Sequence, residues 1–361
     1  MKIAFIIYGS LDTLSGGYLY DRKLVEYLTR CGDRVEMISL PWRDYARYAR
    51  HLADNFSPGL LRRLEHLDVD VLLEDELNHP SLFWVNRRLK QRRVYPIVSL
   101  VHHLRSSELR PAWQNRFYNL VERLYLRSAD GFVFNSRTTQ AAVEALAGTG
   151  RLGVVAYPAA DHLAPQIDAD EIALRARQPD PVHLLFVGNL IRRKGLHTVL
   201  AALSRLPEEA FTLDVVGTMD MDVSYAAAIR RQVAELGLES AVHLHGALSD
   251  GELAAQFRRA QVLVLPSSYE GFGIVYLEGM GFGLPGIATT AGAAGEIISD
   301  GQTGFLIPPE DPQALAACLG RLAADHELLV RMSLAARQRY DLHPTWEQTA
   351  VKIRDYLLTF A

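Results

Sequence analysis

The sequence contains few cysteines, no long apolar run and no large excess of charge. Its two cysteines, Cys31 and Cys318, lie too far apart for a redox or zinc motif. The longest uncharged stretch, Gly279–Gly295, is rich in glycine and contains Pro285, so the sequence predicts no transmembrane helix. The first apolar run, Ile3–Tyr8, is too short for the core of a signal peptide. We therefore expect a cytoplasmic protein.

The formal net charge of −4 is divided unevenly along the 361 residues. Residues 1–165 carry 22 Lys and Arg against 18 Asp and Glu, a balance of +4, and the remainder carries 16 against 24, a balance of −8. A mildly acidic chain is a poor general binder of nucleic acid, whereas the basic first half suits an anionic acceptor or a membrane surface. The 49% hydrophobic and 22% charged residues exclude disorder, collagen and coiled coil.

Short β-branched runs alternate with stretches of helical period, which is typical of parallel sheets covered by helices on both faces. The first set of expected strands comprises Lys2–Tyr8, Arg34–Leu40, Val69–Leu73, Pro96–Val101, Gly131–Asn135 and Gly153–Ala156. The second set comprises His183–Val187, Phe211–Gly217, Val242–Leu244, Val262–Pro266, Gly286–Ala288 and Gly304–Leu306. No sequence repeat is present, so a solenoid is excluded.

The length and the two sets of strands predict an α/β fold with two Rossmann-like domains. We place the first domain in residues 1–160 and the second in residues 182–340. Between them Pro and Asp break both periods, so we interpret residues 161–181 as a linker. The last segment, 341–361, is expected to form a helix that returns to the first domain.

The most informative segment is VLVLPSSYEGFGIVYLE, which begins at Val262. A buried strand leads into Glu270, and a Gly-Phe-Gly turn then opens a helix that holds Glu278 about two turns later. Unpaired amides at the positive end of a helix suit a diphosphate, and carboxylates accept hydrogen bonds from sugar hydroxyls. The alternative is structural, with one acid that favours the helix dipole and a second acid that is solvated.

A similar junction follows the strand at 183–187, in LLFVGNLIRRKG. Two residues end the strand and three cations precede the next helix: Gly188, Asn189, Arg192, Arg193 and Lys194. Cations at the carboxyl end of a strand can hold a polyphosphate leaving group. A basic triplet by itself is more typical of a solvated loop, but the two junctions together predict one convergent site.

These segments resemble the signatures of retaining GT-B glycosyltransferases of family 4. EGFGIVYLE resembles the E-x7-E signature, and GNLIRRKG resembles the G-R-L-x-x-x-K-G phosphate loop. GLPGIATTAGAAGEIISDGQTGFLIPPED and Pro344-Thr345-Trp346 resemble the continuation of the family pattern. The resemblance implies two Rossmann-like domains that face each other across a cleft, which is the GT-B architecture. Asn189 stands where the family has a phosphate-binding Arg, which leaves Arg192 or Arg193 to replace it.

The resemblance also implies roles for single residues. Glu270 would accept hydrogen bonds from the donor sugar, and Glu278 from the nucleotide ribose. Lys194 and an arginine would bind the diphosphate. They would be joined by the amides of the segment that follows Glu270, namely Gly271, Phe272, Gly273 and Ile274.

In the first half, Gly16 and Gly17 follow the first strand, as the acceptor-side glycine loop of the family does; otherwise a Gly-Gly pair is typical of a turn. His102 ends the fourth strand and matches the family's His that contacts the donor sugar, so it joins Lys194 and Glu270 as a catalytic candidate. His103 stands where the family has Asp. A strand-terminal His is otherwise more often a satisfied polar residue. No first-half carboxylate is identified as a nucleophile, and Glu108 is the nearest to His102 in sequence.

Two Asp-x-Asp strings match the metal motif of another glycosyltransferase class. Asp68 and Asp70 precede the third strand, and Asp220 and Asp222 lie after Gly217. We interpret the first string as a strand entry and the second as a helix N-cap. We therefore expect no metal, and no cofactor besides the nucleotide-sugar co-substrate.

Two aromatic and basic segments of the first half, Trp42–Leu67 and Phe83–Arg93, suit contact with a membrane or a lipid acceptor. Trp42, Tyr45, Tyr48/Ala49, Leu52 and Phe56 share one face of a helical wheel, and Arg43, Arg47 and Arg50 lie elsewhere on it. The alternative is an ordinary amphipathic helix that covers the sheet. Peripheral attachment to the inner face of the membrane is therefore an expectation, beside a soluble acceptor.

The residues and the resemblance together predict a retaining hexosyltransferase. Its donor would be a UDP- or GDP-linked sugar held mainly by the second domain, and its acceptor a hydroxyl group in glycan, glycolipid or glycoconjugate synthesis. The alternatives are a sugar phosphorylase or epimerase of the same fold, or a nucleotide-sugar-binding subunit without turnover. An NAD oxidoreductase would need G-x-G-x-x-G after a strand, a spacing that Gly9, Gly16 and Gly17 lack. The nucleobase, the sugar, the acceptor and the oligomeric state do not follow from the sequence.

Overall fold

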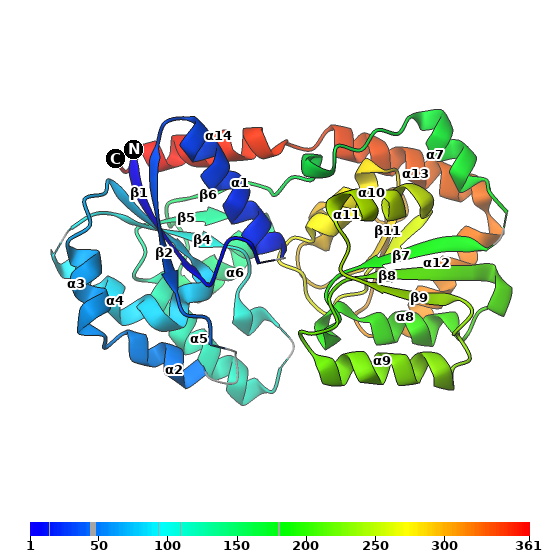
Figure 1. Cartoon of the computed structure of the whole chain (residues 1–361), viewed down its shortest axis with the longest axis horizontal. Coiled ribbons are helices and arrows are strands. Elements are labelled where there is room, and N and C mark those ends of the chain that lie inside the picture. The colour runs from blue at the N-terminus through cyan, green and yellow to red at the C-terminus, as the bar shows by residue number, and fades with distance from the viewer. Residues whose placement is uncertain (14, 44–47, 93, 109, 180) are drawn as a thin grey trace. The chain divides into compact units, whose positions relative to one another are not determined.

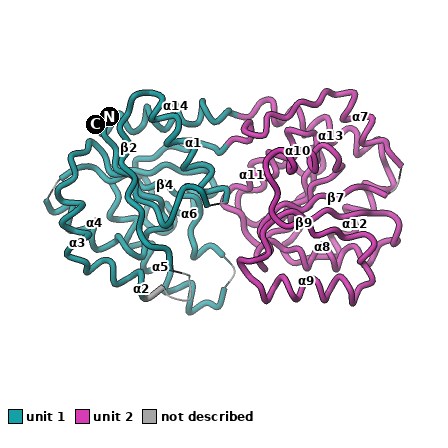
Figure 2. Tube along the Cα trace, in the orientation of Figure 1, with its two compact units in different colours: residues 1–158, 344–361 teal, residues 159–343 magenta. Residues whose placement is uncertain are grey.

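The computed structural model describes residues 1–13, 15–43, 48–92, 94–108, 110–179 and 181–361. Contacts divide the chain into two units (Figure 2). Unit 1 comprises residues 1–158 and 344–361, and unit 2 comprises residues 159–343. Each unit contains a six-stranded parallel sheet with helices, which confirms the predicted α/β fold with two Rossmann-like domains.

The sheet of unit 1 has the order β2-β1-β3-β4-β5-β6. Its strands are β1 (Lys2–Tyr8), β2 (Arg34–Leu40), β3 (Val71–Asp75), β4 (Ile97–Val101), β5 (Gly131–Phe134) and β6 (Gly153–Val155). The central strands are apolar and buried on both faces, as parallel strands are when helices cover both sides. The strand order reverses between β1 and β3. Open α/β sheets bind ligands at the carboxyl ends of the strands at such a point.

The helices of unit 1 are α1 (Gly16–Arg30), α2 (Tyr48–Asp54), α3 (Pro58–Glu65), α4 (His79–Arg92), α5 (Ala112–Leu126), α6 (Arg137–Ala147) and α14 (Trp346–Leu358), with the short turns η2 (Glu76–Asn78) and η3 (Arg105–Ser107). Figure 1 shows α1 and α14 on one side of the sheet and α4 and α5 on the other. Ser15 caps α1 by accepting a hydrogen bond from the amide of Tyr18 at 3.4 Å, and Ser136 caps α6 in the same way.

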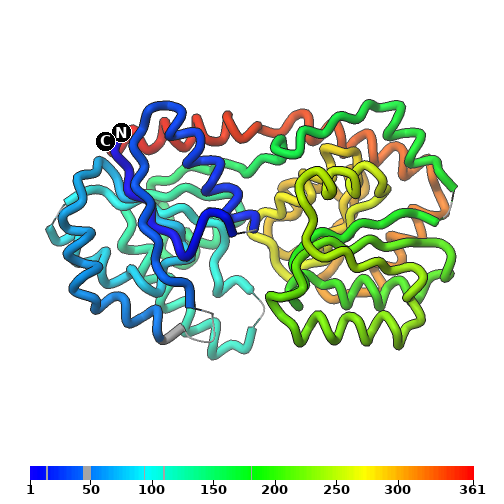
Figure 3. Tube along the Cα trace, in the orientation of Figure 1, coloured from blue at the N-terminus to red at the C-terminus, as the bar shows by residue number. Residues whose placement is uncertain are grey.

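The C-terminal helix α14 lies along α1, although the two are at opposite ends of the sequence (Figure 3). The Trp346 ring packs edge-on against Tyr20, with the centroids 5.6 Å apart. Arg354 pairs with Asp33 at 2.7 Å, and the Tyr356 hydroxyl accepts a hydrogen bond from the amide of Phe132 at 3.2 Å. Residues 344–361 are therefore an integral part of unit 1.

The sheet of unit 2 has the order β12-β11-β10-β7-β8-β9. Its strands are β7 (Val182–Val187), β8 (Phe211–Val216), β9 (Val242–Gly246), β10 (Val262–Val264), β11 (Gly286–Thr289) and β12 (Gly304–Ile307). Its helices are α7 (Ala169–Ala176), α8 (Leu196–Leu203), α9 (Val223–Glu235), α10 (Asp250–Arg259), α11 (Ile274–Gly281), α12 (Pro312–Ala324) and α13 (His326–Asp341), with the turns η4 (Asp161–Leu163), η5 (Arg192–Lys194), η6 (Glu208–Ala210) and η7 (Ala294–Glu296). β7 and β10 are neighbours at the point where the strand order reverses, so a ligand is expected beyond their carboxyl ends.

Residues 161–181, expected as a linker, instead belong to unit 2 and contain α7. Asp168, one of the residues that suggested a break, is the N-cap of this helix and accepts a hydrogen bond from the amide of Glu171 at 2.8 Å. α7 packs on α13, and the buried Arg175 donates to the carbonyl of Phe282 at 2.8 Å. The period was missed because α7 is only eight residues long.

The single helix expected from Trp42 to Phe56 is also corrected. α2 begins at Tyr48, and Ser57 caps a new helix, α3, whose first residue is Pro58. Trp42 lies before α2 with its ring 5.6 Å from that of Tyr8. Tyr45 and Arg47, which the expected pattern included, lie outside the described residues, and the described part of the chain has no helix long and apolar enough to cross a membrane.

The two Asp-x-Asp strings have the structural roles predicted for them. Asp70 accepts a hydrogen bond from the amide of Lys2 at 2.7 Å, and Asp68 pairs with the ammonium group of Lys2 at 2.6 Å, next to the start of β3. Asp222 is the N-cap of α9 and accepts from the amide of Tyr225 at 3.0 Å. Asp220 lies in the loop before that cap.

Candidate functional site

The two junctions predicted to form one site follow β7 and β10 in unit 2, and the structure joins them through an ion pair. The ammonium nitrogen of Lys194 lies 2.6 Å from Oε1 of Glu270. A guanidinium nitrogen of Arg193 lies 3.5 Å from the same oxygen and donates to the carbonyl of Tyr269 at 2.6 Å. All three side chains are largely enclosed, so the pair is a buried feature rather than a surface contact.

The charges of Lys194, Arg193 and Glu270 stabilise one another. Burial would raise the pKa of Glu270, but Lys194 and Arg193 outweigh burial and lower the pKa to about 2. Burial lowers the pKa of Lys194, and the charge of Glu270 opposes that effect. Glu270 is therefore a carboxylate at neutral pH, with fixed acceptor oxygens beside two cations.

Backbone contacts join the segment after β10 to its neighbours, namely the segment after β7 and the segment after β11. The amide of Ser268 donates to the carbonyl of Arg193 at 2.8 Å, and the amide of Ala293 donates to the carbonyl of Glu270 at 2.9 Å. Gly292 has φ +83°, and a Cβ atom there would lie 2.0 Å from the Glu270 carbonyl oxygen. Gly195 has φ +77°, and a Cβ atom there would lie 2.3 Å from the carbonyl oxygen of Pro266. Both positions require glycine because backbone replaces the side chain.

Gly271–Ile274, expected to bind an anion, lead into the first turn of α11. Gly273 is the N-cap with φ +93°, so the amides at the start of α11 have no capping side chain, although the amide of Tyr276 donates to the carbonyl of Gly273 at 3.0 Å. Together with the helix dipole, they favour an anionic group at this point. Phe272 is buried, with its ring 6.0 Å from that of His343. The hydroxyl of Tyr276 fixes the first turn by donating to the carbonyl of Leu265 at 2.7 Å.

The second glutamate of the signature, Glu278, is mostly buried on α11 and faces Nε2 of His162 at 3.4 Å. The charge of Glu278 also acts on Lys194, which associates Glu278 with the ion pair. His162 belongs to the turn η4, inside the stretch expected to be a linker, so its place beside Glu278 was not predicted.

The residues after β7 separate into two groups. The side-chain stem of Lys194 lies over Gly188, whose added Cβ would be 3.5 Å from it. Asn189 instead turns to solvent and donates to the sulfur of Met221 at 3.0 Å. Arg192 is exposed, whereas Arg193 reaches Glu270. Of the two arginines left by the departure at Asn189, Arg193 is therefore the one that lies at the ion pair.

In unit 1 the predicted His102 lies at the carboxyl end of β4 and is held on several sides. Its Nε2 lies 3.0 Å from Oδ1 of Asp21, and its carbonyl oxygen accepts a hydrogen bond from Asn135 at 2.6 Å. The Tyr20 ring packs edge-on at 5.3 Å. A Cβ atom at Gly17 would lie 3.3 Å from the imidazole. The structure thus brings the Gly16-Gly17 loop and His102 together.

Buried carboxylates surround this histidine. Asp21, Asp75 and His102 offer ligand atoms that all lie within 4.8 Å of one another. Burial, followed by the charge of Asp21, raises the pKa of Asp75 to about 7, and burial raises that of Glu76 to about 7. Burial lowers the pKa of His102, but Asp21, Asp75 and Glu76 outweigh it and leave the pKa above its ordinary value. His102 is therefore favoured as an imidazolium.

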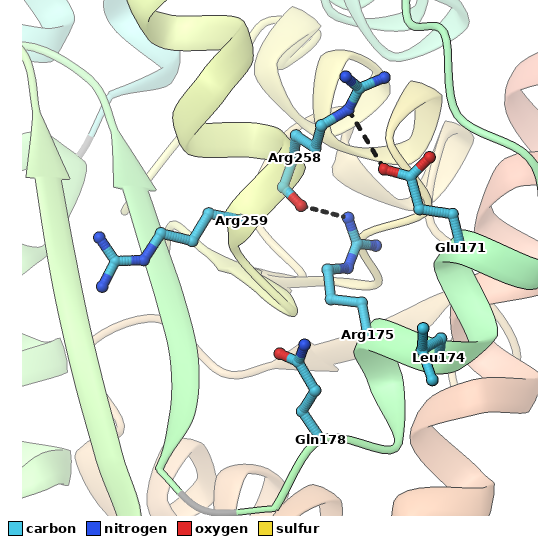
Figure 4. Close-up of a pocket in the computed structure, with 6 residues that line it drawn as sticks. All are labelled: Glu171, Leu174, Arg175, Gln178, Arg258 and Arg259. Atoms are coloured by element: carbon cyan, nitrogen blue, oxygen red, sulfur yellow. Dashed lines mark hydrogen bonds and ion pairs between the residues drawn. The ribbon is translucent and has the colours of Figure 1, made fainter.

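A separate hollow in unit 2 lies between α7 and α10 (Figure 4). Its lining consists of Glu171, Leu174, Arg175, Gln178, Arg258 and Arg259. Arg258 pairs with Glu171 at 3.3 Å, and the side chains of Arg258 and Arg259 point away from each other. None of the predicted site residues lines it, so this hollow is not the expected donor site.

Comparison with known proteins assigns the chain to a family. The family model described as "Glycosyl transferases group 1" matches residues 170–339, and that described as "Glycosyltransferase Family 4" matches residues 20–162. A glycogen synthase of Mycobacterium tuberculosis is 31% identical over 282 residues, which are 75% of this chain and 64% of that protein. The chain belongs to the group 1 glycosyltransferases of family 4. The resemblance noted in the sequence is confirmed.

Further relatives of this glycosyltransferase match shorter stretches or the fold alone. An MMP alpha-(1->4)-mannosyltransferase of Mycolicibacterium hassiacum is 35% identical over 160 residues, 44% of this chain and 38% of that protein. The chain spans 64% of the length of the glycogen synthase. A solved sucrose-phosphate synthase of Thermosynechococcus elongatus has a TM-score of 0.83 at 23% identity, over 99% of this chain and 98% of that one. Anabaena HepE with UDP-glucose has a TM-score of 0.79 at 20% identity, over 99% and 100%.

Sequence reasoning missed three acidic residues around His102, namely Asp21, Asp75 and Glu76. The pattern did hold a signal for two of them, because Asp75 and Glu76 lie two and three positions after the predicted strand Val69–Leu73, near its carboxyl end, where ligand-binding residues of parallel sheets collect. Asp21 lies one position from Tyr20 on the buried face of α1, and only the fold shows that it faces His102. Glu108, the acid nearest to His102 in sequence, pairs instead with His103 at 3.1 Å.

Two clusters of the glycosyltransferase could hold a metal ion among the described residues. One comprises Asp21, Asp75 and His102, and the other comprises the buried Glu76, His79 and Glu122, again with ligand atoms within 4.8 Å. Carboxylates with one imidazole are ligands that suit Mn²⁺, Fe²⁺ or Zn²⁺. Neither cluster contains a predicted Asp-x-Asp string.

We expect Glu270→Gln to lower the free energy of unfolding by about 3–5 kcal/mol at pH 7, because Lys194 then stays buried without its carboxylate. Urea unfolding measures this loss, and the double variant Glu270→Gln/Lys194→Met should recover part of it. The loss should shrink below pH 4, because a carboxylate with a lowered pKa contributes stability above its unfolded pKa and loses it as the pH falls towards about 2. A loss under about 1 kcal/mol at pH 7 would contradict a buried ion pair.

We expect Asp75→Asn to flatten the pH dependence of stability between pH 4 and 7. The pKa of Asp75 is raised to about 7, above the unfolded value of about 3.9, so wild-type stability should fall as the pH rises across this range, by up to about 4 kcal/mol. Urea unfolding at pH 4.5, 5.5 and 7 measures the slope. The exposed Asp170→Asn serves as a control that keeps the wild-type slope. An unchanged slope in Asp75→Asn would show that other groups cause it.

Proposed function

We propose that this protein is a retaining glycosyltransferase that moves a hexosyl group from a nucleoside-diphosphate sugar to a hydroxyl acceptor. The observation that carries the proposal is the buried ion pair of Lys194 and Glu270 beside the uncapped start of α11. This arrangement places cations, amides and a carboxylate at one point, which are the partners that a diphosphate and a sugar require. Family membership and the names of the relatives support the same activity.

The donor would occupy the carboxyl ends of β7 and β10. Its diphosphate accepts hydrogen bonds from the first-turn amides of α11 and from Lys194 and Arg193. Glu270 accepts hydrogen bonds from the sugar hydroxyls, and Glu278 from the ribose hydroxyls. Because the charges of Lys194 and Glu270 are already matched, the site needs no proton transfer to receive the donor.

A uridine donor is the first to test. Solved structures of Anabaena HepE contain UDP or UDP-glucose, and their fold matches this chain over 99% of its length. The names of the glycogen synthase and the mannosyltransferase support hexosyl transfer. GDP-linked sugars are the second donors to test, because no described residue is identified as a contact that would distinguish uracil from guanine.

The chemical step breaks the bond between the sugar C1 and the diphosphate oxygen, and the electron pair leaves with the diphosphate. The acceptor oxygen forms the new bond to C1 on the same face, and its proton goes to an oxygen of the leaving diphosphate. Charge therefore develops on the diphosphate as the bond breaks. Lys194, Arg193 and the α11 amides stabilise this charge without reorganising, because packing and backbone hydrogen bonds already hold them.

Unit 1 would bind the acceptor and would contribute an imidazolium that contacts the sugar. In His102, Nε2 and the carbonyl oxygen are engaged by Asp21 and Asn135, which leaves Nδ1 as the ring nitrogen for a sugar hydroxyl. Asp21 thereby acts as a positioning residue, since it orients the ring and favours its charged form. Gly17 lets the loop approach the imidazole closely.

A thermal-shift screen tests the donor proposal directly. UDP, GDP and ADP, each with its glucose conjugate, should be compared at equal concentration, because a ligand of the native state raises the melting temperature by mass action. We expect one nucleoside diphosphate to give the largest shift. Absence of any shift with all six compounds would overturn a nucleotide-sugar donor.

We expect Lys194→Ala to reduce kcat by about 30- to 1,000-fold, because one charge-assisted contact to the leaving group is worth about 2–4 kcal/mol of barrier. Arg193→Ala should weaken donor binding more than Arg192→Ala, which provides the matched comparison within the same turn. Steady-state kinetics with the donor found in the screen measure both effects, and circular dichroism checks the fold. Wild-type turnover by the Lys194→Ala variant would exclude Lys194 from the proposed mechanism.

We expect transfer to proceed at an unchanged rate in EDTA, because the amides and cations described above neutralise the diphosphate without a divalent ion. The assay compares initial rates in 5–10-fold excess chelator over residual metal, with and without added Mn²⁺ or Mg²⁺. Loss of activity in EDTA and its recovery on adding either ion would instead assign a metal role, with Asp21, Asp75 and His102 as the first ligands to substitute.

A further inference from the structure

Helix α5 of unit 1 has an unusual distribution of polarity. Its inner side carries Val121, Glu122, Tyr125 and Leu126, all buried against the unit. Glu122 is the only acid in the helix, and it is fully enclosed, where the amide of Ser106 donates to it at 3.2 Å. The helix is thus anchored on a side that contains its carboxylate.

The outward side of α5 is apolar and basic. Four large apolar side chains are exposed at helical spacing, with exposed fractions of 71% for Trp113, 43% for Phe117, 57% for Leu120 and 43% for Leu124. Three exposed arginines share this side, namely Arg116, Arg123 and Arg127. We name these seven residues the α5 outer face. Its apolar residues span about 16 Å along the helix axis.

The α5 outer face is the opposite of what a helix that only covers a sheet would present. Such a helix buries its apolar side and exposes its acids and bases to water. Here a carboxylate is buried while a contiguous apolar row is exposed, and large exposed apolar patches mark interaction sites. Single exposed apolar residues would need no explanation, but four in register on one helix do.

The neighbouring helix continues the same chemistry. α4 packs against α5 on the same side of the sheet (Figure 1). Its exposed residues include Trp84, Arg87 and Arg88, and the guanidinium of Arg87 lies 5.4 Å from the Trp84 ring. α4 contains no Asp or Glu, so neither helix presents a carboxylate to solvent.

We propose that the α5 outer face docks on an anionic lipid surface. Its apolar side chains would enter the boundary between headgroups and acyl chains, with the helix lying in the plane of the membrane. The interspersed arginines would bind lipid phosphates, which their planar guanidinium groups fit in a bidentate manner. Trp113, at one end of the row, has the apolar ring and polar N–H that favour the headgroup level.

Charge separates this partner from a second copy of the chain. A symmetric dimer through the α5 outer face would bring arginines from both copies together with no acid on either helix to pair them. A surface of anionic lipid instead attracts every one of these cations. The proposal does not depend on the donor or acceptor of the enzyme, because the α5 outer face contains no residue of the candidate site.

Vesicle sedimentation with the full chain tests the proposal. The probe is a vesicle of phosphatidylglycerol and phosphatidylcholine, with pure phosphatidylcholine as the neutral comparison. We expect binding to the anionic vesicle that weakens from low to high salt, since the attraction is screened. Trp113→Ser/Phe117→Ser should lower the partition coefficient at least tenfold. Arg116→Gln/Arg123→Gln should lower it about 30-fold and reduce its salt dependence.

Matched controls change exposed residues of unit 2. Leu174→Ser/Leu342→Ser removes two apolar side chains that are 70% and 77% exposed, and Arg230→Gln/Arg231→Gln removes two exposed cations of α9. Both controls should bind vesicles as the wild type does. The nucleotide thermal shift, read in parallel, should be unchanged in all four variants. It separates failure of this proposal from failure of the donor proposal.

Three results would overturn the proposal. The first is that the wild type stays in the supernatant with anionic vesicles at low salt. The second is that both α5 variants bind as tightly as the wild type. Alternatively, light scattering would show a wild-type dimer that Trp113→Ser/Phe117→Ser converts to a monomer, which would make the face a contact between two copies. In the supporting case the emission of Trp113 shifts to shorter wavelength with vesicles, and this shift is absent in Trp113→Ser/Phe117→Ser.

Discussion

The buried ion pair of Lys194 and Glu270 is the interaction on which the organisation of unit 2 around its ligand edge depends. Each charge would be costly to bury alone, and together they are stable only while the segments after β7 and β10 stay in register. This requirement explains the close backbone approach at Gly195, where a side chain would separate the two segments; a side chain at Gly292 would in the same way separate the segment after β10 from the one after β11. The groups proposed to act in catalysis are thus held by the same contacts that stabilise the fold.

The charged cluster of unit 1 also lies at the carboxyl ends of parallel strands, but there the acidic groups outnumber the basic ones. At the carboxyl ends of β3 and β4, the carboxyl groups of Asp21, Asp75 and Glu76 outnumber the single imidazole of His102. Burial keeps part of this cluster protonated near neutral pH, and a hydroxyl-bearing ligand with little charge fits such a setting. The cations of unit 2 therefore suit an anion, and the cluster of unit 1 suits a neutral group.

The sequence predicts the strands well, and it predicts that the segments after β7 and β10 meet, because both predictions depend on local signals. β-branched runs mark the strands, and glycines mark the turns that lead from each strand into the next helix. Contacts set by tertiary structure were not accessible in this way. Asp21 reaches His102 across 81 positions of the sequence, and α7 was taken for a linker because Asp168 serves as a cap. The outer side of α5 was overlooked because a helical period alone does not show which side is buried.

The return of α14 to unit 1 determines the order in which the two units can be completed during synthesis. Unit 2 occupies one continuous stretch of chain, whereas unit 1 needs residues from both ends of the sequence. During synthesis unit 2 is therefore complete while Tyr20 and Phe132 still lack their partners Trp346 and Tyr356. Residues 344–361 can complete unit 1 only after unit 2 has been synthesised, so a nascent chain that stops before them exposes the apolar surface of α1.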